Sequence, residues 1–204
     1  MKSRPRLLAI VGSQRKGGNS CALAKAVLET VDADSEIVEL ADVRVDFCDV
    51  CERCAHGDCV LQDGFNGILE KMRRADGIVF SVPKYLFVGS KFLCFLERLA
   101  TVNHMREHGG YERGFRNPEY RLFEEEKPFC VLLLSGTGRV ERQTVKTVAE
   151  YVEGTGLRLI RHDKPPFFGV SIKAGDRRGE VLDNGCGLAE CARLVRKVVD
   201  SVTS

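Results

Sequence analysis

The sequence predicts an α/β fold in which a doubly wound, five-stranded parallel sheet carries helices on both faces. Short apolar runs alternate five times with segments of helical periodicity, which is the pattern of consecutive βαβ units. The apolar runs 7–11 and 129–134 lack the alternation of a half-exposed strand, so we expect both to be buried on two faces of a parallel sheet. Ligands of such sheets bind at the carboxyl ends of the strands.

The first half of the chain predicts three strands and three helices. Strands are expected at 7–11, 36–40 and 77–82, the last of which is stopped by Pro83. Apolar residues at helical spacing predict a first helix through residue 31, a second from Asp63 to residue 72 and a third over 89–99. We expect Asn19 and Ser20 to cap the first helix and Asp63 to cap the second.

The second half repeats this pattern after a charged stretch. Residues 101–127 lack a clear period, and we interpret them as a long excursion from the domain. The run 129–134 is the most apolar and is expected at the centre of the sheet. A helix that ends near Gly154, a fifth strand at 157–160 and a closing helix at 187–202 follow.

The composition is typical of a soluble globular protein. The 204 residues are 44% apolar and 29% charged, which suits a single domain, 1–204, with a substantial core. A net charge of +2 gives no support for nucleic-acid binding, and no apolar run is long enough to cross a membrane. The basic amino terminus lacks a cleavage site for secretion. Nine cysteines in such a chain predict a reducing, cytoplasmic location.

A glycine-bearing turn, residues 12–20, joins the first strand to the first helix. Such a turn offers backbone N–H groups and the positive end of the helix dipole to a phosphate. It has neither the lysine of a Walker A turn nor the glycines of a dinucleotide fingerprint, so it favours a phosphate that is held, as in flavin mononucleotide (FMN). A tight turn without a ligand is the alternative. The side-chain donors of the turn are Ser13, Arg15, Asn19 and Ser20.

Two further loops at strand ends are candidates for contact with a flavin ring. The first follows the third strand and brings two aromatic rings to the place where an isoalloxazine needs flat apolar contacts. Ordinary packing is the alternative for both rings. This loop consists of Pro83, Lys84, Tyr85, Leu86 and Phe87, and the second loop consists of Ser135, Gly136, Thr137 and Gly138.

The loop 44–63 contains Cys48, Cys51, Cys54 and Cys59, separated by two, two and four residues. Four thiolates bind an iron–sulfur cluster, and a compact run of this kind can wrap one cuboidal centre. Structural zinc usually takes two Cys-x-x-Cys pairs with a longer spacer. We therefore expect a [4Fe–4S] cluster, with zinc or free thiols as the alternatives. We assign no catalytic residue, and no chemistry to the other five cysteines.

Together these motifs resemble the flavodoxin-like NAD(P)H-dependent FMN reductases and, within them, the iron–sulfur flavoproteins. The matching segments are the 12–20 turn, the cysteine loop, residues 82–98 and residues 135–138. The resemblance implies a flavodoxin-like fold, with the FMN phosphate in the 12–20 turn and its ring between the 83–87 and 135–138 loops. It also implies a homodimer or homotetramer and leaves NAD(P)H open as the electron donor. The family usually has aspartate where this chain has Glu97, and the 101–127 stretch is longer than expected.

The function that we expect is electron transfer. A flavin exchanges electrons singly or in pairs and a cluster exchanges them one at a time, so the two can connect a carrier such as ferredoxin to a two-electron small-molecule acceptor. One alternative is an NAD(P)H-dependent FMN or quinone reductase without a cluster. Another is a metal-stabilised binding module that has no enzymatic activity.

Overall fold

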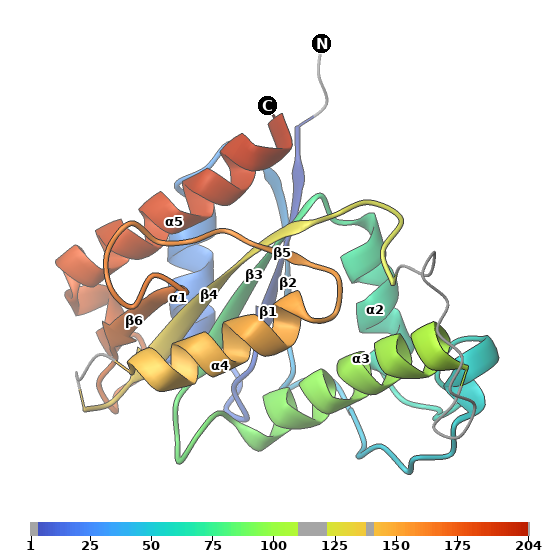
Figure 1. Cartoon of the computed structure of the whole chain (residues 1–204). Coiled ribbons are helices and arrows are strands. Elements are labelled where there is room, and N and C mark those ends of the chain that lie inside the picture. Colours follow the sequence, from blue (N-terminus) through green and yellow to red (C-terminus); the bar gives the residue numbers. More distant parts are fainter. Residues whose placement is uncertain (1–3, 110–121, 138–140, 204) are drawn as a thin grey trace.

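The computed structural model describes residues 4–109, 122–137 and 141–203 (Figure 1). The strands are β1 (Arg6–Val11), β2 (Asp34–Glu39), β3 (Gly77–Pro83), β4 (Pro128–Ser135), β5 (Arg158–Leu159) and β6 (Val170–Lys173). They form one parallel sheet in the order β2-β1-β3-β4-β5, with β6 also paired to β4. The direction of winding reverses between β1 and β3, which is where ligands bind in doubly wound sheets.

The fifth position in the sheet is shared by two short strands. β5 pairs with Pro128 and Phe129 at the start of β4, and β6 pairs with residues 132–135 at its end. Between them the chain leaves the sheet through residues 160–169. The predicted parallel sheet with five strand positions is confirmed, whereas the strand at 170–173 is not predicted by the sequence.

Helices cover both faces of the sheet. α1 (Asn19–Leu28) and α5 (Gly185–Thr203) lie on one face, and α2 (Phe65–Arg74), α3 (Ser90–His108) and α4 (Arg142–Glu153) lie on the other (Figure 1). Successive residues of β1 alternate between the two cores: Leu7 and Ala9 face α1 and α5, while Leu8 and Ile10 face the other three helices. Burial on both faces explains why this strand is a continuous apolar run.

α3 is longer than the predicted helix 89–99, so the excursion expected over 101–127 is wrong for residues 101–108. Val102 and Met105 are buried and continue the apolar stripe of Leu99 at a spacing of three residues. The charged outer face of the helix hides this period in the sequence. Gly109, at a left-handed φ of 68°, ends α3. Residues 110–121 of the predicted excursion lie outside the described ranges.

The helix starts differ in part from the prediction. Gly18 is the N-cap of α1, so the expectation that Asn19 and Ser20 cap this helix is wrong, because both belong to its first turn. Asp63 precedes the α2 N-cap, Gly64, and its carboxylate accepts the Phe65 N–H at 3.0 Å.

Two 3-10 turns, η1 (Arg53–His56) and η2 (Glu180–Asp183), complete the described structure. None of the helices in the described ranges combines the length and the apolar character that a membrane crossing requires.

Candidate functional site

Loops at the carboxyl ends of four strands meet around one pocket of about 220 Å³. These loops follow β1, β3, β4 and β6. A larger polar hollow of about 650 Å³ is lined by Arg6, Asp76 and Lys127 at the amino ends of the strands, whereas ligands of doubly wound sheets bind at the carboxyl ends. We therefore place the site in the smaller pocket. Its lining consists of Ser13, Arg15, Gly18, Asn19, Ser20, Pro83, Lys84, Tyr85, Leu134, Gly136, Ala174, Gly175 and Asp176.

The turn after β1 is fixed by one hydrogen bond within the turn and by another to the end of β2. The Ser13 hydroxyl accepts the Arg15 N–H at 3.0 Å, which closes the turn. Gly17 adopts a φ of 58°, which residues with a side chain rarely adopt. Its N–H donates to the Glu39 carboxylate at 2.8 Å and ties the turn to the end of β2. The turn therefore has a fixed conformation at the entrance to α1.

The start of α1 presents unused donors to the pocket. Within the described ranges, the backbone N–H groups of Gly18, Asn19 and Ser20 have no acceptor, as expected for the first residues of a helix. A bound anion satisfies such groups and is also favoured by the helix dipole. This arrangement fits a phosphate group.

Two side chains of the turn cross the pocket to the loop after β6. The Arg15 guanidinium donates to the Asp176 carbonyl at 3.3 and 3.4 Å, and the Asn19 amide nitrogen donates to the Gly175 carbonyl at 2.7 Å. The Asn19 Oδ1 atom is buried, and no hydrogen-bond partner is found for it in the described structure. Such an orphan acceptor fits a ligand hydroxyl. Residues 174–176 are missing from the sequence prediction because the strand that leads to them is missing too.

The residues of the 83–87 loop lie partly at the pocket and partly away from it. Pro83, Lys84 and Tyr85 line the pocket, and the Lys84 ammonium lies 3.2 Å from the Glu141 carboxylate. Leu86 is 99% exposed and is absent from the lining. Phe87 lines a separate groove between α3 and α4, which agrees with ordinary packing. Of the five predicted flavin contacts in this loop, Pro83, Lys84 and Tyr85 therefore lie at the pocket, whereas Leu86 and Phe87 do not.

The loop after β4 contributes less than expected. Gly136 lines the pocket, whereas Ser135 is buried and its hydroxyl lies 3.0 Å from the Thr137 hydroxyl. Gly138 lies outside the described ranges. The assignment of these loop residues as FMN ligands stays a prediction.

The cysteine loop follows β2 and lies beside the second half of α3. Cys54 is buried in η1, and Cys48, Cys51 and Cys59 are half-buried. Burial raises the pKa of the Cys54 thiol to about 11, and the neighbouring thiols Cys59, Cys48 and Cys51 add to this effect. The four sulfurs are therefore near enough to interact electrostatically. Val50, which precedes Cys51, has a left-handed φ of 52° that is unusual for a β-branched residue.

The four thiols match an iron–sulfur centre in their chemistry. Within the described ranges, no three His, Cys, Asp or Glu side chains are arranged as ligands of a single metal ion. A [4Fe–4S] cluster uses four cysteine thiolates, and four neighbouring thiols on one loop supply that donor set.

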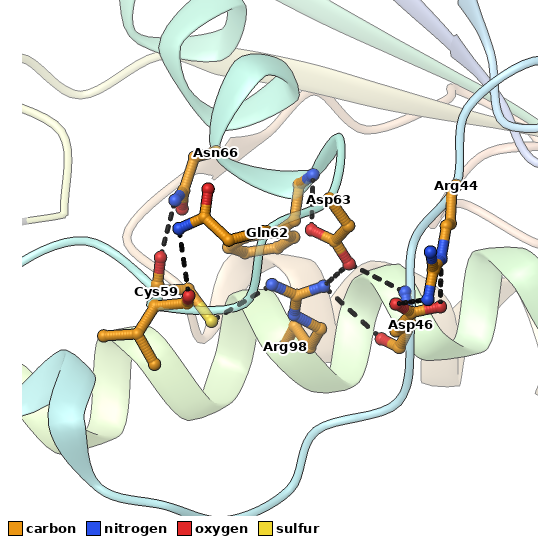
Figure 2. A network of polar contacts seen from close by, with 9 residues as sticks. Arg44, Asp46, Cys59, Gln62, Asp63, Asn66 and Arg98 are labelled. Carbon is orange, nitrogen blue, oxygen red and sulfur yellow. Dashed lines mark hydrogen bonds and ion pairs between the residues drawn. The ribbon is translucent and has the colours of Figure 1, made fainter.

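A buried ion pair that the sequence does not reveal anchors this loop (Figure 2). The Arg98 guanidinium from the middle of α3 pairs with the Asp63 carboxylate, and both side chains are almost completely buried. The same guanidinium lies 4.3 Å from the centre of the Phe65 ring. Burial alone would raise the pKa of Asp63, but hydrogen bonds from the Asp46 N–H and from Arg98 outweigh it and hold the pKa below its usual value. The carboxylate is therefore ionised in the interior.

Arg98 also contacts a candidate ligand. Its Nη2 atom donates to Cys59 Sγ at 3.0 Å, and Nη1 lies 3.4 Å from the Asp46 carbonyl (Figure 2). The sequence marks Arg98 only as part of the 82–98 segment, because nothing local shows that an arginine on an apolar helix face meets a loop forty residues earlier.

The chain is similar in sequence to known flavoproteins. A family model described as NADPH-dependent FMN reductase matches residues 5–108, which is half of the chain. An iron-sulfur flavoprotein of Methanosarcina thermophila is 35% identical over 85 residues, covering 40% of this chain and 44% of the relative. One of Methanocaldococcus jannaschii is 33% identical over 84 residues, covering 39% and 44%. The matches thus span less than half the length of these relatives.

Solved structures of low sequence identity share the fold. A flavone reductase superposes with a TM-score of 0.67 at 17% identity, over 98% of this chain and 63% of that one. A flavodoxin from the domain Archaea superposes with a TM-score of 0.56 at 13% identity, over 98% and 99%. The fold is therefore flavodoxin-like. By its sequence match, its sheet order and the 12–20 turn at its switch point, the chain belongs to the NADPH-dependent FMN reductase family, whose members are flavin-dependent oxidoreductases.

Proposed function

We propose that this protein is a flavin-dependent oxidoreductase that holds FMN in the pocket at the carboxyl ends of β1, β3 and β4. The observation that carries the proposal is the convergence of the unpaired α1 N–H groups with Arg15 and the orphan Asn19 Oδ1 atom on one pocket. Each matches one part of the ligand: a dianionic phosphate for the donors and the cation, and a ribityl hydroxyl for the orphan acceptor. The family match supports this assignment.

The roles of the chain's own residues follow from this placement. The 12–20 turn orients the phosphate through Ser13, Arg15 and Ser20. The ring is held between Tyr85 on one side and the Gly136 loop on the other. The half-exposed Tyr85 leaves one edge of the pocket open to a small-molecule acceptor or to NAD(P)H. When bound, FMN supplies transfer of electrons singly or in pairs.

We further propose that Cys48, Cys51, Cys54 and Cys59 hold a [4Fe–4S] cluster. The spacing of the thiols and the similarity to two archaeal iron-sulfur flavoproteins support it. A cluster beside a flavoprotein domain provides a one-electron entry, so the physiological partner is a carrier such as ferredoxin and the acceptor is a small molecule that takes two electrons.

A second candidate function is an NAD(P)H-dependent FMN or quinone reductase that uses no cluster. The description of the matching family favours it, since the match over residues 5–108 includes the cysteine loop but its name specifies only NADPH and FMN. In this case the four thiols remain free.

The deciding experiment is anaerobic purification followed by measurement of flavin, iron and acid-labile sulfide. The proposal expects FMN together with about four iron and four sulfide atoms per chain. FMN without iron supports the second candidate. Failure to bind FMN on reconstitution contradicts both and leaves a binding module without a flavin. Size-exclusion chromatography of the same material tests the predicted homodimer or homotetramer.

A further inference from the structure

A charged side chain is buried in the middle of α3. Arg98 is 1% exposed, and its countercharge, the Asp63 carboxylate, has no exposed side-chain surface. A charge in the interior is costly unless its countercharge and its hydrogen bonds are all in place. The other hydrogen-bond acceptors of this guanidinium therefore indicate why a charge is buried here.

The two terminal nitrogens of the guanidinium donate to oxygen and to sulfur, whereas no partner is found for the buried Nε in the described structure. Nη1 serves Asp63 and the Asp46 carbonyl, whereas Nη2 donates to Cys59 Sγ at 3.0 Å. An arginine whose only role is to neutralise a carboxylate can direct two parallel N–H groups at it. Here one terminal nitrogen is directed at a thiol that we assign as a cluster ligand.

Cys59 is held more firmly than its location in a loop implies. Its carbonyl accepts the Asn66 amide at 2.6 Å, and its sulfur accepts Arg98. Asp63 accepts the Asp46 N–H at 2.8 Å, so the two ends of the cysteine loop are joined at the same ion pair. Cys59 thus has a fixed position near the end of the cysteine loop.

We propose that Arg98 positions Cys59 as a ligand of the cluster and that its N–H···S hydrogen bond raises the reduction potential of that cluster. The inference rests on the proposed function, because it requires a cluster at the four cysteines. The reduced form carries one more negative charge than the oxidised form, so a donor and a cation at a ligand sulfur stabilise it more. Burial of the guanidinium strengthens the effect, since the interior screens charge weakly.

The chain contains a matched control on the same helix. Arg106 lies eight residues beyond Arg98 and also binds the cysteine loop, but only through oxygen. Its Nε atom donates to the Gly57 carbonyl at 3.0 Å and lies 3.4 Å from the Cys54 carbonyl, and its Nη2 atom lies 2.8 Å from the Asp58 carboxylate. Both arginines are positively charged, lie on α3 and contact the cysteine loop, but of the two only Arg98 donates a hydrogen bond to sulfur.

The first test compares Arg98→Lys with Arg106→Lys. Both substitutions keep the charge and replace the guanidinium fork by a single ammonium, which cannot reach Asp63 and Cys59 in the same way. Anaerobically purified variants are reduced with dithionite, and the midpoint potential of the cluster is followed by electron paramagnetic resonance (EPR). We expect a lower potential and faster iron release to a chelator for R98K, and the wild-type potential for R106K, which loses only contacts with oxygen. Equal potentials and equal iron release in all three proteins overturn the proposal.

A second test uses the protein with Arg98 intact and does not depend on how R98K folds. Protein grown with arginine labelled at its guanidinium nitrogens is reduced and measured by pulsed EPR. We expect coupling between a labelled nitrogen and the cluster in the wild type, and also in Arg53→Lys, which alters the exposed arginine near Cys51. No coupling, or its loss in R53K, contradicts the role of Arg98. A wild-type protein that binds FMN but no iron contradicts the proposed cluster itself.

Discussion

Arg15 illustrates how one residue joins two loops of the candidate flavin pocket. It lines the pocket beside the unpaired α1 N–H groups and donates to the Asp176 carbonyl. Replacing it with alanine removes a charged donor, and hydrogen bonds to charged groups contribute about 1.5–3 kcal/mol. We predict that Arg15→Ala weakens FMN binding about 10- to 100-fold. Quenching of FMN fluorescence during titration with apoprotein measures the change.

The matched control for Arg15 is Arg177, which directly follows Asp176 in the chain. Arg177 pairs with Glu180, its side chain is 82% exposed, and it is absent from the pocket lining. Arg177→Ala is expected to bind FMN like the wild type. Equal FMN affinities for R15A and R177A would contradict the assignment of Arg15 as a ligand of the FMN phosphate.

The buried pair of Asp63 and Arg98 predicts a large stability effect for one residue. Asp63→Ala leaves the Arg98 charge buried without its partner, and removal of one member of such a pair costs about 3–5 kcal/mol. Glu70→Ala is the control, because the pairs of Glu70 with Arg73 and Arg74 are exposed and such pairs contribute less than about 1 kcal/mol. Urea unfolding of both variants gives the two free energies. Similar values for the two would contradict the structural role of the pair.

At the scale of elements, the segment between β5 and β6 is fastened to α5 by one carboxylate. Glu190 of α5 accepts a hydrogen bond from the Lys164 ammonium at 2.8 Å and lies 2.9 Å from His162 Nε2. Lys164, and after it His162, lower the pKa of Glu190 from 4.5 to about 2. A carboxyl whose pKa is lower in the folded state stabilises that state above its unfolded pKa. This stabilisation is therefore complete above pH 4.5 and is lost as the pH falls towards 2.

Glu190→Gln tests this fastening through its pH dependence. The variant lacks the carboxylate at every pH, so we expect it to be less stable than the wild type at pH 7 and nearly equal to it at pH 2. Thermal melting at both pH values measures the two differences. A difference that does not change with pH would assign the effect to packing rather than to charge.

The elements that the sequence predicts best are those whose own residues specify them. The buried strands β1, β3 and β4 are continuous apolar runs, and their positions agree with the prediction to within one or two residues. β6 has only four residues, which is too short for a period to be recognised. Its path depends on Gly169, where a Cβ atom would lie 2.4 Å from the Val131 carbonyl. That contact exists only after the sheet has formed.

In the whole molecule, α3 separates the two candidate sites. Its first turn adjoins the flavin pocket, because the Gln14 side chain donates to the Ser90 hydroxyl at 2.8 Å, while Arg106 near its end holds η1 (Figure 1). Arg98, which contacts the candidate ligand Cys59, is eight residues from Ser90, or about 12 Å at 1.5 Å per residue, and Arg106 is sixteen residues away, or about 24 Å. We therefore expect the two proposed cofactors to bind independently of each other.

This independence predicts the outcome of Cys51→Ser. The variant is expected to lose cluster iron and to keep FMN affinity, because Cys51 is absent from the pocket lining. Cys186→Ser is the control, since this exposed cysteine lies at the start of α5 and should affect neither. Iron analysis and flavin titration of the anaerobic proteins give both quantities. Full iron in C51S would exclude Cys51 as a ligand.

Part of the candidate site could be predicted because its residues are adjacent in the chain. The 12–20 turn, Pro83 to Tyr85 and Gly136 come together as their positions at strand ends indicate. Leu86 and Phe87 do not join them, since neighbouring residues of an extended loop point in different directions. Ala174 to Asp176 could not be predicted without β6.

By itself, the sequence determined the alternation of strands and helices, the glycine-bearing 12–20 turn and the set of four thiols, because each depends on the spacing of nearby residues. Only the tertiary structure decided that the fifth strand is divided, that residues 174–176 close the pocket, and that Arg98 meets Cys59 and Asp63. These contacts join segments thirty or more residues apart, and the burial that makes them strong arises only when the helices pack on the sheet.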